Sequence, residues 1–271
     1  MVHKTLKKEN HLLVCCIYPA LFILILSFCI PCNVYSQDLS DVEQQTAIMQ
    51  YTLKYRFGKD LKVGDMVKYS DESGEGEEPT VIELKVSGEK NGNLMIDESI
   101  QGMLIHYLIN PAQMKLVSIT GTDDEGKDLD IKPLSDERFG QIMGMVKSTM
   151  QEQGSFAQFI AWEKGSESEE VTTPAGGFKC IFLHPKYSEM YAQQIKGYEE
   201  SLRSQGKSDA EIKKMIYQNE PRLYFNNDVP KLLPMNIAMG WMPWIEAFEG
   251  IEAGLVESRH MAGLKLTGYK K

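Results

Sequence analysis

The stretch TVIELKVSGEKNGNLMIDESIQGMLIHYLIN (80–110) contains three runs of alternating or continuous apolar residues, separated by short polar segments. Such runs are typical of β-strands, because successive side chains of a strand point to opposite faces of a sheet. The segment EKNGN (89–93) contains Asn-Gly, a residue pair that two-residue hairpin turns prefer. Connections this short join antiparallel neighbours, since parallel strands need a longer crossover. The stretch therefore predicts an antiparallel meander.

The same pattern continues on both sides of this stretch. GDMVKYSD (64–71) precedes it and QMKLVSITGT (113–122) follows it, so the meander is expected to span 64–122. The C-terminal part of the chain, 222–270, returns to strand-like composition. Its three expected strands are RLYFNNDVP (222–230), GLVESRHMAG (254–263) and LKLTGYK (264–270).

Two segments that flank the meander predict helices. The first, 40–56, begins with a capping box formed by Ser40 and Glu43. The second, 135–151, begins at Ser135 with two acids in its first turn, and its apolar residues recur at helical spacing. Helices beside an antiparallel sheet place the chain in the α+β class, mainly antiparallel β.

A helical pair is expected as an insertion at 188–218. Apolar residues recur at helical spacing in its first half, and SDAE (208–211) is a capping box for its second half. The charged outer faces indicate that this pair packs on the sheet or extends over an opening. The earlier segment FAQFIAWEKG (156–165) fits either a strand or a continued helix.

The segment GGFKCIFLHP (176–185) contains a cysteine and a histidine four residues apart, which raises the question of a catalytic pair. Its aromatic and β-branched residues, with glycines before and a proline after, predict a strand. Residues four apart in a strand are separated by roughly 13 Å, whereas a nucleophile and its base need about 3 Å. We therefore expect Cys180 to be a small buried apolar residue and His184 to end the strand.

The N-terminal segment 1–36 has the features of a secretory signal: a basic start, an apolar run and small residues before a cleavage site. Cleavage is expected after Ser36, which leaves one exported domain, 37–271, in the periplasm. An uncleaved anchor is the alternative, because the run from Leu12 to Ile30 is long enough to span a bilayer. Pro31 precedes Cys32, which argues against lipidation of that cysteine.

The charge of the chain argues against nucleic acid as a partner. Residues 1–36 carry three lysines and one glutamate, so removing this +2 takes the formal net charge from −9 to −11. Nucleic acids and anionic membrane surfaces bind clustered Lys and Arg instead. The acidic segments 70–79, 122–130 and 165–170 lack the ligand register of an EF-hand, so we expect solvated turns and no metal site.

Enzyme signatures are missing from the expected mature sequence. Its histidines, His106, His184 and His260, are far apart and in no metal-ligand spacing. No GxSxG, phosphate-loop or dinucleotide motif occurs either. The sequence therefore predicts a non-catalytic protein without a cofactor.

The segment PMNIAMGWMPWIEAFEGIEA (234–253) is the richest apolar and aromatic run after the N-terminal segment. One interpretation is a buried helix or strand pair. The other is a hydrophobic lid over a ligand cavity or at a bilayer interface, so peripheral membrane contact remains possible.

The order of these elements resembles the LolA/LolB-type half-barrel exported proteins. The motifs that carry the resemblance are Thr173, Pro174, Gly176 and Phe178, then Val229 and Pro230, then Gly254 to Val256 with Leu264 and Leu266. The insertion at 188–218 and the missing acylation cysteine depart from that pattern. The resemblance implies a curved incomplete β-barrel covered by helices, with the 135–151 helix as part of a lid over an apolar cavity that carries acyl chains.

Two functions follow from these observations. The first is a carrier or sensor that binds the acyl chain of a lipid or lipoprotein, because methionine-rich linings suit flexible chains. The alternative is an envelope scaffold or assembly protein, whose aromatic run docks an envelope protein and whose cavity is filled by its own side chains. The expected cavity or lid residues are Phe139, Met143, Val146, Met150, Met239, Trp241, Met242, Trp244 and Phe248.

Overall fold

The computed structural model describes residues 41–71, 79–122, 126–154, 159–217, 220–240, 242–259 and 263–271. Residues from 40 onward belong to one compact unit. Its strands are β1 (Met66–Asp71), β2 (Thr80–Lys90), β3 (Asn93–Ile100), β4 (Met103–Asn110), β5 (Lys115–Thr122), β6 (Asp128–Ile131), β7 (Phe159–Lys164), β8 (Glu169–Thr173), β9 (Gly176–Tyr187), β10 (Arg222–Asn226), β11 (Gly254–Arg259) and β12 (Leu264–Lys270).

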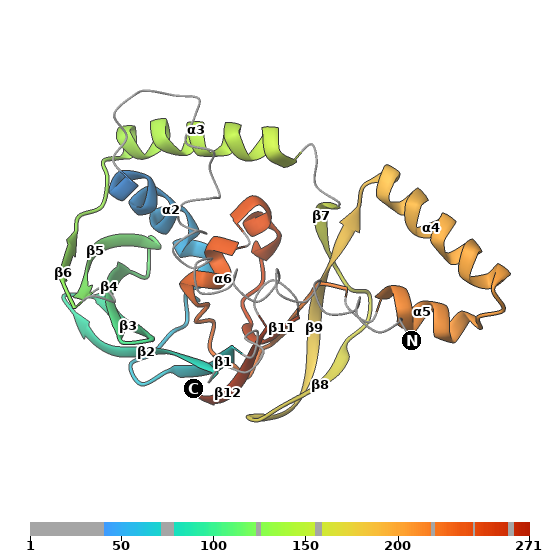
Figure 1. Ribbon diagram of the computed structural model, residues 1–271. Coiled ribbons are helices and arrows are strands. Elements are labelled where there is room, and N and C mark those ends of the chain that lie inside the picture. Colours follow the sequence, from blue (N-terminus) through green and yellow to red (C-terminus); the bar gives the residue numbers. More distant parts are fainter. Residues whose placement is uncertain are drawn as a thin grey trace, which may run out of the picture. The chain divides into compact units, whose positions relative to one another are not determined.

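These strands form one sheet in the order β6-β5-β4-β3-β2-β1-β12-β11-β10-β9-β7, with β8 paired to β9 (Figure 1). Every pairing between them is antiparallel. Among the described strands, β6 and β7 end the order without pairing to each other, so the sheet does not close on itself. The predicted α+β class with a mainly antiparallel sheet is confirmed.

The predicted meander is confirmed as β1 to β5. Two of its turns have two central residues with positive φ, Asn91-Gly92 at 54° and 74° and Gln101-Gly102 at 47° and 86°. This backbone matches the twist of antiparallel neighbours, which is why Asn-Gly predicted the first turn. The sequence prediction missed β6, because it assigned the acidic segment 122–130 to a solvated turn.

One face of the meander is buried and the other faces solvent. In β2, for example, Ile82, Leu84 and Val86 are fully buried, whereas Val81 is 57% exposed. This alternation follows from the two-residue period of a strand. The buried apolar side chains of the meander are Val67, Tyr69, Ile82, Leu84, Val86, Leu94, Ile96, Ile100, Tyr107, Ile109, Leu116 and Ile119.

Helices cover this buried face. The predicted N-terminal helix is confirmed as α2 (Asp41–Arg56), which contacts β5 and lies beneath α3 (Asp136–Gly154) in Figure 1. The Ser135 hydroxyl accepts a hydrogen bond from the Arg138 amide at 3.3 Å, which confirms the predicted start of α3. The first predicted capping box paired Ser40 with Glu43, and Ser40 lies outside the described residues.

The ambiguous segment before the cysteine strand is β7, and its neighbour β9 is longer than expected. His184 does not end the strand, because β9 continues to Tyr187 and pairs there with β7. Pro185 fits this pairing, since proline is tolerated where its missing N–H is not needed by the ladder. The Thr-Pro motif forms the turn between β8 and β9, in which Thr173 faces Gly176.

The predicted helical pair is α4 (Glu189–Ser204) and α5 (Asp209–Tyr217). Its second capping box is reciprocal: the Glu211 amide donates to the Ser208 hydroxyl, and the Ser208 amide donates to the Glu211 carboxylate. The pair was expected to pack on the sheet or to extend over an opening, and its main contacts are between its own two helices. The helices pack on each other through buried Leu202 and Ile212, and Figure 1 shows them beyond the end of β9.

The aromatic run folds as two short helices, α6 (Met235–Gly240) and the 3₁₀ helix η1 (Met242–Phe248). Ile237, Ala238, Ile245 and Phe248 are buried. Both helices contact α2, and η1 also contacts α3 and β7. Among the described helices, none combines the length and apolar composition needed to cross a membrane.

Candidate functional site

A pocket of about 470 Å³ lies between strands β7 and β9 and the segment that follows η1. Residues from four separate parts of the chain line it: Trp162, Lys164, Ile181, Leu183, Asn227, Ala247, Glu249, Gly250, Ile251, Glu252 and Ala253. The volume falls within the roughly 300–1,000 Å³ that ligand pockets occupy.

The register of β7 and β9 builds one wall. Lys164 faces Leu183 and Trp162 faces Pro185 in this antiparallel pair. Residues two apart in a strand point to the same side, so Trp162 and Lys164 share a face with Leu183 and Ile181. The amide of Gly165 donates to the Phe182 carbonyl at 2.9 Å and ties the end of β7 to β9.

The opposite wall is the end of η1 and the turn that follows it, residues 247–253. Gly250 has a φ of 74°, a left-handed conformation that favours glycine. The Ile251 amide donates to the Phe248 carbonyl at 3.1 Å, and the Gly254 amide donates to the Val229 carbonyl at 3.0 Å. Ile251 and Ala253 are buried, so this wall is anchored in the core.

Charged side chains surround the apolar walls at the rim. Lys164, Glu249 and Glu252 are all exposed. The Glu252 carboxylate lies 3.9 Å from the Lys231 ammonium, whose pKa is lowered by burial. No ion pair joins Lys164 to another residue in the described part of the chain. The pocket thus combines apolar walls with a rim that carries both signs of charge.

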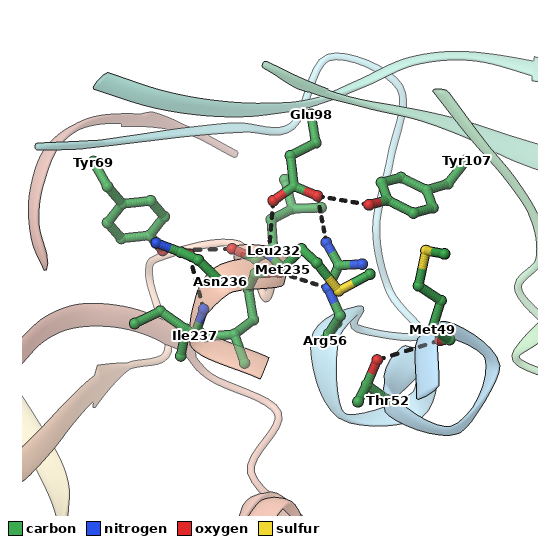
Figure 2. A network of polar contacts seen from close by, with 11 residues as sticks. Met49, Thr52, Arg56, Tyr69, Glu98, Tyr107, Leu232, Met235, Asn236 and Ile237 are labelled. Carbon is green, nitrogen blue, oxygen red and sulfur yellow. Dashed lines mark hydrogen bonds and ion pairs between the residues drawn. The ribbon is translucent and has the colours of Figure 1, made fainter. Parts of the chain in front are cut away.

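A buried polar network lies elsewhere in the core, at the C-terminal end of α2 (Figure 2). The Arg56 guanidinium donates to the Glu98 carboxylate at 2.6 Å and to the Leu233 carbonyl at 3.0 Å. Glu98 also accepts from the Tyr107 hydroxyl at 2.8 Å and from the Met235 amide at 2.7 Å. Three distant segments therefore converge on one carboxylate.

The environment of this network indicates a structural role. Arg56 is completely buried and Glu98 is 2% exposed, so neither can reach a ligand from solvent. Burial disfavours the charge on Arg56, but Tyr107 and Glu98 outweigh it and raise the pKa of the guanidinium. The rings of Phe57 and Tyr107 lie 4.7 and 4.8 Å from the guanidinium carbon and complete the enclosure.

A second, shallower pocket of about 370 Å³ lies on the solvent-facing side of β4, β5 and β6. His106 lines it and contacts the Asp97 carboxylate through Nδ1 at 2.7 Å. The strand register continues this row to Thr120 and Asp130. From the sequence, His106 was expected to be far from the other histidines; the two-residue turn at Gln101-Gly102 already places Asp97 opposite it.

Of the nine expected cavity residues, the four that the structure describes, Phe139, Met143, Val146 and Phe248, line neither of the two pockets. Met143 and Val146 are buried in α3, whose contacts are with α2 and η1, and Phe139 is half-buried. Phe248 is buried edge-to-face against Phe225. Trp241 lies outside the described residues, as do the side chains of Met150, Met239, Met242 and Trp244.

The residues that do line the larger pocket were missed by the sequence analysis. Trp162, Ile181 and Leu183 were expected only as members of apolar runs. The available signal was their spacing, because 162 and 164 share one face of β7, as 181 and 183 share one face of β9.

Two further expectations concern Cys180, expected to be a small buried apolar residue, and metal sites, of which none was expected. Cys180 is completely buried, as predicted, and burial raises the pKa of its thiol to about 12. This keeps the thiol protonated and unreactive. Within the described ranges, no group of three or more His, Cys, Asp or Glu side chains is arranged to hold a metal ion.

Comparisons with known proteins add no relative. No protein-family model matches the chain, and neither a curated protein nor a solved structure matches it significantly.

Proposed function

We propose that this protein is a non-catalytic periplasmic carrier or sensor that binds the acyl chain of a lipid or lipoprotein. The observation that carries the proposal is the pocket between β7, β9 and residues 247–253, whose walls are Trp162, Ile181, Leu183 and Ile251. Burying an acyl chain against such walls is favourable at about 25 cal/mol per Å² of apolar surface.

The architecture supports this proposal. The antiparallel sheet is open, as the proposed curved, incomplete barrel requires, and the pocket lies between strands β7 and β9 and the segment at the end of η1. The barrel is what the resemblance to LolA/LolB-type proteins implies, and the periplasmic location follows from the secretory signal expected at 1–36. The position differs from the expected one beneath α3, so the proposal rests on the pocket and not on the expected lid residues.

Lipid content of the purified protein tests the proposal. Residues 37–271 would be produced in a periplasm, purified without detergent and extracted for lipid mass spectrometry. The wild type is expected to carry about one acyl chain per protein, and Ala247→Trp, which fills the pocket, is expected to lose it. Ala192→Trp, on the exposed surface of α4, is the matched control and should retain the lipid. A stable wild type without lipid would refute the carrier function.

The scaffold function is the second candidate, and the helical pair α4–α5 favours it. Three apolar side chains on this pair are exposed: Met190 by 69%, Tyr198 by 53% and Met215 by 47%. Contiguous exposed apolar surface marks protein contacts in many proteins, and we propose that these three side chains contribute to such a surface. A photo-crosslinking residue at Tyr198 should then trap one envelope protein in cells, whereas the same residue at Ala112 in the β4–β5 turn should not.

A further inference from the structure

The polar residues at the rim of the pocket are placed to contact the head group of an acyl ligand. Apart from Lys164, Asn227, Glu249 and Glu252, the pocket is lined by apolar residues and one glycine. We propose that the ligand is a single-chain zwitterionic amphiphile, whose head group carries an ammonium and a phosphate. This inference rests on the proposed acyl-binding function and specifies its ligand class.

The volume of the pocket limits the ligand to one chain. A volume of about 470 Å³ accommodates about 16 groups the size of a water molecule, at roughly 30 Å³ each. One acyl chain of ordinary length has about that number of carbon atoms. A second chain would need twice the space, so a lysophospholipid fits the pocket and a two-chain phospholipid would leave one chain outside it.

Two carboxylates favour an ammonium at one side of the rim. Glu249 and Glu252 flank the tight turn at Gly250, so they project from the same short segment. Glu252 is 59% exposed, and its contact with the Lys231 ammonium is 3.9 Å, longer than a hydrogen bond. Its oxygens can therefore accept hydrogen bonds from a primary ammonium, and such charge-assisted bonds are about twice as strong as neutral ones.

A lysine favours a phosphate on the other side. Lys164 points to the pocket from β7, while the preceding Glu163 points to the opposite face and pairs with Lys186 at 2.9 Å. The neighbouring carboxylate is therefore engaged elsewhere and does not neutralise Lys164. The side-chain amide of Asn227, also at the rim, can donate a further hydrogen bond to a phosphate oxygen.

The net charge of the protein favours a zwitterion over an anion. Residues 37–271 carry a formal charge of −11, obtained from −9 for the chain and +2 for residues 1–36. A field of this sign disfavours the approach of fatty acids and anionic lysolipids. A head group with no net charge avoids this repulsion and still uses both kinds of charge at the rim.

Competition for a fluorescent acyl probe tests the proposal on delipidated 37–271. The competitors are lysophosphatidylethanolamine, lysophosphatidylglycerol and palmitate, each below its micelle concentration. We expect lysophosphatidylethanolamine to displace the probe at about tenfold lower concentration than the two anions, which corresponds to ~1.4 kcal/mol. The Glu249→Gln/Glu252→Gln variant should lose this preference by binding the anions better. Lys186→Gln, on the opposite face of the strands, is the control and should keep it.

The outcomes separate the two proposals. Equal displacement by all three competitors, or stronger displacement by the anions, would refute the head-group assignment and leave acyl binding intact. A probe that does not bind the wild type, although the protein is folded by circular dichroism, would refute acyl binding and the head-group assignment together. An unchanged preference in the double glutamine variant would show that the two carboxylates do not select the ligand.

Discussion

Replacing Arg56 with methionine removes the cation from the buried network while keeping an unbranched side chain of similar length. The variant loses the bond to the Leu233 carbonyl and the ion pair at 2.6 Å to Glu98, whose side chain is 3% exposed. Removing one partner of a buried ion pair costs about 3–5 kcal/mol, because the other charge stays buried without compensation. The free energy of unfolding of a protein is typically about 5–15 kcal/mol, so this loss is a large fraction of the total stability.

Urea unfolding and thermal unfolding of residues 37–271, both followed by tryptophan fluorescence, measure this loss. For a chain of this size each kcal/mol lowers Tm by about 2–4 °C, so Arg56→Met is expected to melt roughly 6–20 °C below the wild type. Arg203→Met is the matched control, because its partner Asp209 is 85% exposed and such pairs contribute at most about 1 kcal/mol.

A double variant provides a second test of the same network. Replacing both charges, in Arg56→Met/Glu98→Leu, leaves no uncompensated ion, so the double variant should be more stable than Arg56→Met alone. If Arg56→Met unfolds within about 1 kcal/mol of the wild type, or if the double variant is the least stable of the set, the network does not hold the fold together as argued.

Three further outcomes follow from individual contacts. Phe178→Ala should destabilise the protein by about 3–5 kcal/mol, measured as a fall in Tm, because Phe178 is 6% exposed and packs on the Tyr269 ring; an unchanged Tm would show that β9 is not central. Burial raises the pKa of Cys180 to about 12, so thiol reagents at pH 8 should modify it only in urea, and rapid labelling of the native protein would contradict the burial. Ser208→Ala removes the two hydrogen bonds of the Ser208 hydroxyl with Glu211 and keeps the backbone N–H bond to the Glu211 carboxylate; it should cost α5 about 1 kcal/mol, seen as faster amide exchange confined to that helix.

Much of the local structure could be predicted from sequence, for physical reasons visible in single segments. The strands at Asn93–Ile100 and Met103–Asn110 coincide with the second and third apolar runs of the 80–110 stretch, because a two-residue turn with positive φ leaves only one register for its flanking residues. The cap at Ser208 was also predictable, since its partner lies three residues away. Signals of this kind need only a few neighbouring residues.

The candidate site was less predictable than the strands that build it. Its lining joins residues near 162, 182, 227 and 250, and each looks like an ordinary core or loop residue in its own segment. The expected site residues were chosen because methionine and tryptophan were concentrated in the 135–151 and 234–253 segments. A high content of methionine and tryptophan shows only that a segment is apolar. Some apolar residues of these two segments, including Met143 and Phe248, are buried in the core.

The sequence by itself determined the strands of the meander, the helix α2 and the paired helices α4 and α5. Each depends on periodicity or on a turn within about ten residues. Only the tertiary structure decided that β1 pairs with β12, that Arg56 meets Glu98, and that β7, β9 and residues 247–253 enclose a pocket. Any antiparallel partner offers a strand the same backbone hydrogen bonds, so the residues of one strand do not predict which strand pairs with it. A charged residue in the last turn of a helix is ordinarily exposed, and only the distant carboxylate of Glu98 makes the burial of Arg56 possible.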